Sequence, residues 1–336
     1  MPSRSEKFVA RSWPFREEFT IALAGRRVRL GEHTIICGIV NVTPDSFWDG
    51  GRYLNPNRAI RYALELAKAG ADWIDVGGES TRPGSEPVGA EEELRRVLPV
   101  IQGIHQRAPR LPISIDTTKG IVAEEAICAG AVIINDISGL RFDPRLADVA
   151  RRHRAPLVLM HLRGRPATMQ RRPFAHSIWR SLSRGLAWSI QRAVSLGVPP
   201  SQLIIDPGLG FGKTRRQNFE IIARLARLKR FHLPILAGAS HKSFIQAVVA
   251  GKRLDGRKAN PSAYWKLTKE KASARSAASE LALQVELALD FGDAAAIAGL
   301  TLGGAHILRV HNVAAALPAA RIADAILTAN PPKLAK

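Results

Sequence analysis

The chain has 336 residues, of which 46% are hydrophobic and 23% charged, a balance typical of folded globular proteins and not of disordered ones. Its 49 Lys and Arg residues against 29 Asp and Glu give a net charge of +20, which attracts polyanions, but no RNA-binding or zinc-finger motif accompanies it, so a nucleic-acid partner is not favoured. The two cysteines exclude a disulfide scaffold, and no apolar run reaches the roughly 20 residues needed to span a membrane.

Residues 1–30 form a basic N-terminal extension. Within it, the segment FTIALAGRRVRLG predicts a small β-hairpin that would cover the floor of a barrel. The N-terminus has no signal-peptide core. Cys37 lies in a predicted strand and Cys128 on a predicted helix, and we interpret both as buried thiols in a reducing compartment. We therefore expect a cytoplasmic protein.

Eight short apolar runs follow, each with polar residues at its carboxyl end. Runs of this kind, bounded by turn residues, are typical of strands buried on both faces of a parallel sheet. They lie in segments 35–51, 73–84, 113–119, 132–139, 157–161, 203–213, 235–243 and 306–313. Because helical segments separate most of them, they predict an α/β fold, a (β/α)8 TIM barrel over residues 31–330, with its chemistry at the carboxyl ends of the strands.

Helical spacing of apolar residues predicts the outer helices of this barrel. They are expected at 57–69, 91–106, 119–129, 144–153, 177–196, 217–230, 272–289 and 315–329. One stretch breaks the alternation, because about sixty residues separate the seventh run from the eighth. Within it, residues 252–271 are strongly basic and include Tyr264 and Trp265. We interpret this segment as an insertion between strands seven and eight.

Polar residues that end buried strands are the first candidates for chemistry. Asn41 follows strand one, and Asp116, Asn135 and Asp206 end strands three, four and six. Buried acids cost several kcal/mol unless they are paired, so this set is not expected from packing alone. It suits a ligand edge rich in N–H donors and acceptors, such as a heteroaromatic ring. A divalent metal site is the alternative.

Cationic residues at the same ends of the strands predict an anion site. Arg309 and His311 alternate on strand eight and therefore share one face. Lys242 follows strand seven, where a lysine can form a Schiff base, neutralise an anion or donate to a carbonyl. The segment DPGLGFGK at 206–213 lacks the spacing of a nucleotide phosphate loop, although Phe211 can offer an aromatic face.

These motifs, in this order, resemble those of the dihydropteroate synthases of the folate pathway: NVTPDSFWDGG, GGESTRPG, IDTTK, NDISG, LMH, DPGLGFGK, SHKS and RVHNV. The resemblance runs from about residue 31 to residue 313. It implies a transferase that condenses 6-hydroxymethyl-7,8-dihydropterin diphosphate with p-aminobenzoate, giving 7,8-dihydropteroate and diphosphate, with Mg²⁺ assisting. Members of the family are commonly dimers, so the resemblance also implies a homodimer.

The resemblance also implies a role for each matching residue. It assigns the pterin to Asp116, Asn135, Met160, Asp206 and Lys242, the diphosphate to Thr81, Arg82, Arg309 and His311, and p-aminobenzoate to Phe47, Pro83, Phe211 and Ser240. Asn41 would ligate Mg²⁺. The implied catalytic residues are Asn41, Asp116, Asp206 and Lys242.

Two positions depart from the family pattern. His241 stands where the family usually has Arg, and Asn312 where it usually has Asp. The shorter His puts substrate affinity and the response to sulfonamides in question. Two alternatives therefore stay open: a methyltetrahydrofolate-dependent methyltransferase, which needs no diphosphate site, and a catalytically silent pterin-binding paralogue. The presence of Asn41, Arg82 and Lys242 favours an active synthase.

Overall fold

A computed structural model describes residues 16–23, 25–43, 55–80, 85–166, 168–170, 173, 176–251, 254 and 275–329, with side chains from 287 onward in the last range. Apart from residue 254, the basic insertion expected at 252–271 lies outside the described residues. Within the described part of the chain, no helix is both long enough and apolar enough to cross a membrane.

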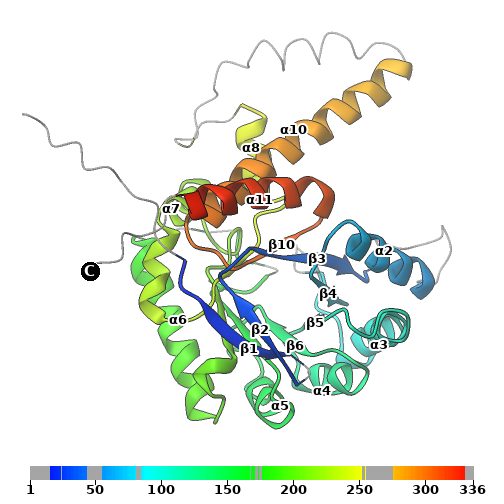
Figure 1. Ribbon diagram of the computed structural model, residues 1–336, viewed down its shortest axis with the longest axis vertical. Helices are drawn as coiled ribbons and strands as arrows, with labels where there is room; N and C mark the ends of the chain where they lie inside the picture. The colour runs from blue at the N-terminus through cyan, green and yellow to red at the C-terminus, as the bar shows by residue number, and fades with distance from the viewer. Residues whose placement is uncertain are drawn as a thin grey trace, which may run out of the picture.

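Eight parallel strands form a barrel surrounded by helices, which confirms the expected fold (Figure 1). The strands neighbour one another in the order β8-β7-β6-β5-β4-β3-β10-β9, and a parallel bridge between Ile205 and Ile235 joins the two ends of this series. The barrel strands are β3 (Ile35–Asn41), β4 (Trp73–Gly77), β5 (Ile113–Asp116), β6 (Ile133–Asp136), β7 (Leu157–Met160), β8 (Leu203–Asp206), β9 (Leu236–Ala237) and β10 (Ile307–Val310).

The outer helices largely follow the predicted ranges. They are α2 (Pro56–Lys68), α3 (Ala90–Arg107), α4 (Gly120–Cys128), α5 (Arg145–His153), α6 (Ile178–Ser195), α7 (Arg215–Ala223), α8 (Ser243–Val249), α10 (Arg275–Leu302) and α11 (Val313–Ala329). Side chains cap several of them: Ser177 accepts from the Arg180 N–H at the start of α6, and Thr214 and Gln217 form a capping box at the start of α7.

Two of the predicted helices differ from the structure, and one helix was not predicted. The helix expected at 217–230 ends at Ala223 and continues as the 3-10 helix η2 (Leu225–Phe231), and α8 was not expected. The helix expected to end at 289 continues to Leu302 as α10. Gly292 lies inside this helix, where a Cβ atom would come 2.6 Å from a Val249 side-chain carbon. The glycine, which normally weakens a helix, is here the point at which α10 approaches α8 closely.

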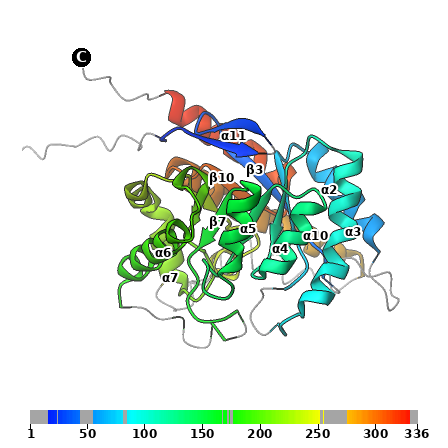
Figure 2. The ribbon, with the colours of Figure 1, turned by 90° about the horizontal axis from the view of Figure 1, so that it is seen from below.

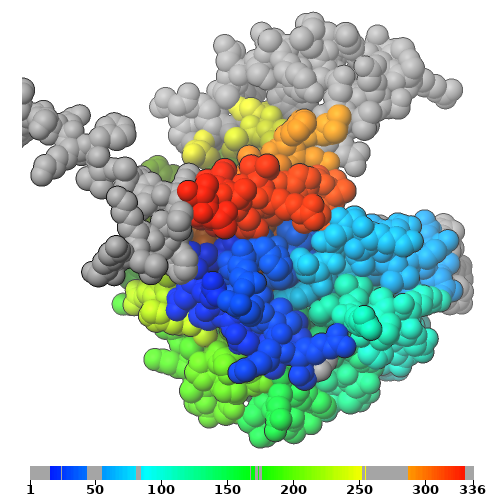
Figure 3. Space-filling view, viewed as in Figure 1, coloured from blue at the N-terminus to red at the C-terminus, as the bar shows by residue number. Residues whose placement is uncertain are grey.

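An N-terminal hairpin covers one end of the barrel (Figures 2 and 3). Strands β1 (Phe19–Leu23) and β2 (Arg26–Leu30) pair antiparallel, as expected from the sequence. Their apolar side chains join a cluster with residues from the amino ends of the barrel strands: Ile21, Leu23, Leu30, Ile35, Cys37, Trp73, Ile133, Val158, Ile204, Leu236 and Ile307. The opposite end of the barrel, where the strands finish, therefore remains for the polar residues.

Candidate active site at the carboxyl ends of the barrel strands

The register of the sheet brings the predicted polar residues to one level. Gly77 pairs with both Asn41 and Asp116, and Asp116 also pairs with Asn135. One cavity at this barrel mouth is lined by the predicted residues Asp116, Asn135, Met160, Asp206, Phe211, Ser240, Lys242, Arg309 and His311. Asn41, half-buried at the end of β3, is not among the residues that line it. The predicted positions Phe47, Thr81, Arg82 and Pro83 lie outside the described residues.

A largely buried ion triad forms the floor of the site. Arg309 donates from Nε to Asp75 Oδ2 at 2.5 Å and from Nη2 to Asp116 Oδ2 at 2.7 Å. Asn135 donates to the same Asp75 oxygen at 3.1 Å. Burial raises the pKa of Asp116 to about 7, although the Arg309 charge opposes this shift. Asp75 is therefore part of the site. In the sequence, it can be identified as a carboxylate inside an otherwise apolar strand.

This triad also bears on the anion site predicted for Arg309. Two carboxylates already accept from its guanidinium, so the side chain neutralises acids at the floor of the site. The remaining N–H groups of an arginine can still reach an anion. Binding of diphosphate by Arg309 therefore stays a prediction.

Asp206 and Lys242 lie on the opposite side of the cavity from β4 and β5. The Gly208 N–H donates to Asp206 Oδ1 at 2.6 Å, and burial raises the pKa of Asp206 to about 6. Lys242 Nζ lies 4.4 Å from the centroid of the Phe211 ring, within the range of a cation–π contact. Burial lowers the pKa of Lys242 to about 8. Acid, amine and aromatic ring thus meet in one small space.

Lys213 ties down the glycine-rich loop after β8. Its Nζ donates to the carbonyl oxygens of His161, Gly208 and Phe211 at 3.1, 2.6 and 3.0 Å. Burial lowers the pKa of this lysine to about 7. A Cβ atom at Gly208, where φ is +64°, would lie 2.2 Å from the His161 carbonyl oxygen. The glycines and the lysine of this loop therefore serve its tight backbone, in agreement with the absence of phosphate-loop spacing.

The β9–α8 loop is held from α10. The Ser240 hydroxyl donates to Asp293 Oδ2 at 3.0 Å, and the His241 N–H donates to the same oxygen at 2.9 Å. The His311 N–H donates to Ser240 Oγ at 3.3 Å. The His241 and His311 rings stack, with centroids 4.9 Å apart and planes 7° apart. Sequence reasoning missed Asp293, because a helical acid far along the chain carries no motif.

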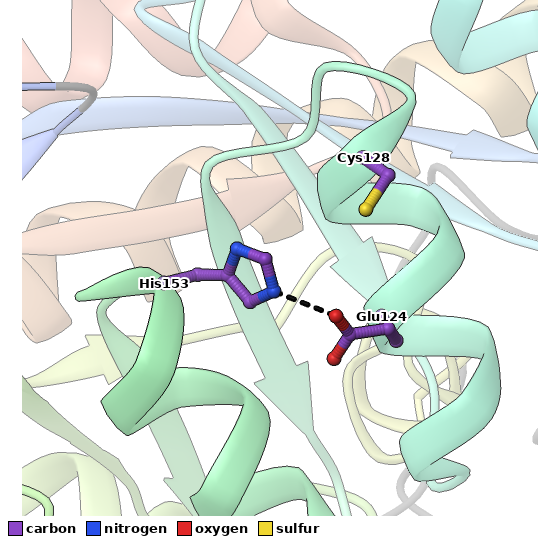
Figure 4. A group of neighbouring side chains, drawn as sticks. All are labelled: Glu124, Cys128 and His153. Atoms are coloured by element: carbon purple, nitrogen blue, oxygen red, sulfur yellow. Dashed lines mark hydrogen bonds and ion pairs between the residues drawn. The ribbon is translucent and has the colours of Figure 1, made fainter.

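A different group of possible metal ligands lies away from the mouth (Figure 4). Glu124 and Cys128 on α4 and His153 at the end of α5 form the one such group found among the described residues. Glu124 is already satisfied, because it accepts from Arg152 at 2.5 Å and contacts His153 at 2.8 Å. Cys128 is exposed, which corrects the expectation of a buried thiol, whereas Cys37 is buried as expected. The helix buries Val122, Ala123 and Ala126 and leaves Cys128 on its exposed side.

Comparison with known proteins gives a consistent result. The family model Pterin binding enzyme matches residues 37–311. Dihydropteroate synthase from Synechocystis is 40% identical over 88% of this chain and 91% of its own length, and the Escherichia coli K12 enzyme is 38% identical over 89% and 93%.

Solved structures agree with the sequence relatives. Xanthomonas albilineans dihydropteroate synthase with 4-aminobenzoic acid is 36% identical, with a TM-score of 0.75 over 94% of this chain and 100% of its own. The same enzyme in complex with 7,8-dihydropteroate gives a TM-score of 0.72 at 35% identity, over 93% and 100%. The Yersinia pestis enzyme in complex with a sulfonamide drug gives 0.76 at 33% identity, also over 93% and 100%. The chain therefore belongs to the pterin-binding enzyme family and, within it, to the dihydropteroate synthases.

Proposed function

We propose that this chain condenses 6-hydroxymethyl-7,8-dihydropterin diphosphate with p-aminobenzoate. The observation that carries the proposal is the convergence of Asp116, Asn135, Asp206 and Lys242 on one cavity at the barrel mouth. Acid and amide side chains together match a flat ring whose edge presents both N–H donors and acceptors. The relatives named above include enzymes with 4-aminobenzoic acid and with 7,8-dihydropteroate bound.

The reaction needs no strong general base. The bond between the pterin methylene carbon and the diphosphate oxygen breaks, and the leaving diphosphate takes the electron pair. The aniline nitrogen then forms the new C–N bond and releases one proton to solvent or to the diphosphate. Positive charge develops on the pterin, and the buried carboxylates Asp116 and Asp206 stabilise it. Arg309 and His311 are proposed to stabilise the departing anion.

Magnesium is proposed to arrive with the diphosphate. Asn41 ends β3 with a half-buried amide, and an amide oxygen is a ligand that this hard cation accepts. No group of three acidic, His or Cys ligands converges at the mouth among the residues that the structure describes. The residues that the structure describes therefore fit a metal held by Asn41 and by substrate oxygens. When bound, such a cation neutralises charge on the diphosphate.

We further propose a homodimer in the cytoplasm. Exposed apolar side chains gather on α10 and α11, which contact each other: Leu287, Phe291, Ile322 and Ile326. Phe291 is 73% exposed, and exposed apolar residues that are grouped, unlike single ones, indicate a protein–protein contact. Sedimentation of wild type and Phe291→Asp tests this. If the dimer forms through this face, wild type sediments as a dimer and the variant as a monomer. Free cysteines support a reducing compartment.

A coupled assay tests the proposed activity. Purified protein is mixed with the pterin diphosphate, p-aminobenzoate and Mg²⁺, and dihydropteroate and diphosphate are followed together. Equimolar formation of both supports the synthase. Tight pterin binding without product contradicts it, and methyl transfer from methyltetrahydrofolate is then the reaction to test. Inhibition by a sulfonamide in the same assay asks whether the pocket beside His241 accepts the drug class bound by the Yersinia pestis relative.

His311→Ala separates the two halves of the site. If His311 binds the anion, the variant weakens diphosphate binding more than p-aminobenzoate binding. Equal losses for the two ligands would mean that His311 is only structural. Calorimetry with each ligand measures both affinities.

A further inference from the structure

Asp293 is a buried carboxylate on an outer helix, outside the set of residues that line the cavity. It nevertheless reaches the β9–α8 loop, since its Oδ2 accepts both the Ser240 hydroxyl and the His241 N–H. The third group near the same oxygen is His241 Nε2, at 3.8 Å. One oxygen of α10 therefore organises consecutive residues of an active-site loop.

The backbone of this loop needs such an anchor. His241 has φ = +55°, the left-handed region that residues other than glycine rarely adopt. Conformations of this kind persist when the surroundings hold them in place, and they are common beside active sites. The bond from the His241 N–H to Asp293 holds this residue directly.

The groups on either side of His241 belong to the cavity. Lys242 follows it and places Nζ over the Phe211 ring. Ser240 precedes it and accepts the His311 N–H, and the His311 ring stacks on that of His241. A change in the loop would therefore move the amine, the hydroxyl and the imidazole together.

We propose that Asp293 is a positioning residue, which sets the geometry of Lys242, Ser240 and His311 by anchoring the β9–α8 loop from α10. It touches neither substrate itself. The proposal deepens the synthase function proposed above, and its kinetic test rests on that function. His241, the position that departs from the family pattern, lies within this arrangement, with its Nε2 3.8 Å from the anchoring oxygen.

Three substitutions separate position from charge. Asp293→Asn removes the charge but keeps an oxygen that can accept both bonds. Asp293→Glu keeps the charge but moves the carboxylate by one methylene, and Asp293→Ala removes the acceptor. Asp290→Asn is the matched control, because Asp290 lies on the same helix and accepts from Asn312 Nδ2 at 3.0 Å.

We expect Asp293→Ala and Asp293→Glu to lower kcat/KM by roughly 10- to 100-fold, as displacements near 1 Å do at reacting groups. Asp293→Asn should stay within about 3-fold of wild type and so act as the conservative rescue, and Asp290→Asn should match wild type. Thermal melting reports folding in each case. If Asp293→Ala does not fold, the Glu variant carries the test. Equal losses in Asn and Glu variants, or wild-type kinetics in folded Ala or Glu variants, would overturn the proposal.

Crystal structures of wild type and Asp293→Glu provide a readout that needs no activity. The proposal expects His241 to leave the left-handed region, and Lys242 to leave the Phe211 ring, in the variant alone. An unchanged loop overturns it. If wild type makes no product, the synthase function fails, and this structural comparison still decides whether Asp293 positions the loop.

Discussion

Replacement of Asp206 tests the pterin site most directly. Asp206 lines the cavity and the Gly208 N–H already occupies Oδ1, so we expect Oδ2 to accept from the ligand. In Asp206→Asn the amide oxygen can keep the Gly208 bond, which turns an NH₂ group toward the ligand. The ring then loses a charge-assisted hydrogen bond of about 1.5–3 kcal/mol and meets a donor in its place, at a further cost of about 1–3 kcal/mol. The combined loss of about 2.5–6 kcal/mol predicts roughly 10²- to 10⁴-fold weaker pterin binding.

Calorimetry with the pterin diphosphate at pH 8 measures this loss, because Asp206, with its pKa raised to about 6, is ionised there. Asp206→Ala should also lose pterin binding, and it leaves the Gly208 N–H without its acceptor, which costs about 1–3 kcal/mol of stability. The fold should survive both changes, as thermal melting will show.

Asp136 supplies a matched control for this experiment. It also ends a barrel strand and is buried, but its oxygens accept from the Ser138 and Leu140 N–H groups at 2.8 and 2.6 Å. Asp136→Asn leaves one of these donors facing an amide NH₂, so it should cost about 1–3 kcal/mol of stability and leave pterin affinity unchanged. Unchanged affinity in Asp206→Asn, or equal losses in the two variants, would refute the assignment.

Two further predictions concern charge. Arg309→Met leaves the Asp75 and Asp116 carboxylates without their cation, so the free energy of unfolding at pH 8, measured by urea titration, should fall by about 3–5 kcal/mol. At pH 5 the fall should be smaller, because Asp116, with its pKa raised to about 7, is protonated there and no longer needs a cation. A loss of stability that is larger at pH 5 than at pH 8 would contradict this. Asp116 and Asp206 have raised pKa values of about 7 and about 6 and become neutral below them, whereas Lys242 has a lowered pKa of about 8 and becomes neutral above it. kcat/KM should therefore rise between pH 5.5 and 7.5 and fall above about 8. Lys242→Arg should abolish only the alkaline fall, and a profile that still falls there would assign it to another group.

The barrel and the polar rim of its mouth could be predicted because both are local in sequence. An apolar run marks each buried strand, and the next polar residue must lie where that strand ends. Asp116, Asn135 and Asp206 were found in this way, and they line one cavity. The barrel fixes the register of the strands, so no further sequence signal is needed to predict that these three side chains converge.

The partners of these residues could not be predicted, because they depend on contacts between distant segments. Arg309 was expected to face an anion, yet its closest partners are Asp75 and Asp116, 234 and 193 residues earlier in the chain. His241 stood out as a departure from the family, but its anchor Asp293 lies 52 residues later on a helix. Only the packing of α10 against the loop reveals that contact.

The hairpin at the barrel floor extends the cooperative unit beyond the sequence signature of the family. That signature covers residues 37–311, whereas Ile21, Leu23 and Leu30 of the hairpin are almost fully buried. At about 1.5–3 kcal/mol for each apolar side chain, their burial contributes about 5–9 kcal/mol as an upper estimate, comparable with the whole stability of a typical domain. A fragment trimmed to the signature would expose Trp73 and its neighbours to water and tend to aggregate. The slowest amide exchange should accordingly lie at this floor, far from the end where substrates enter.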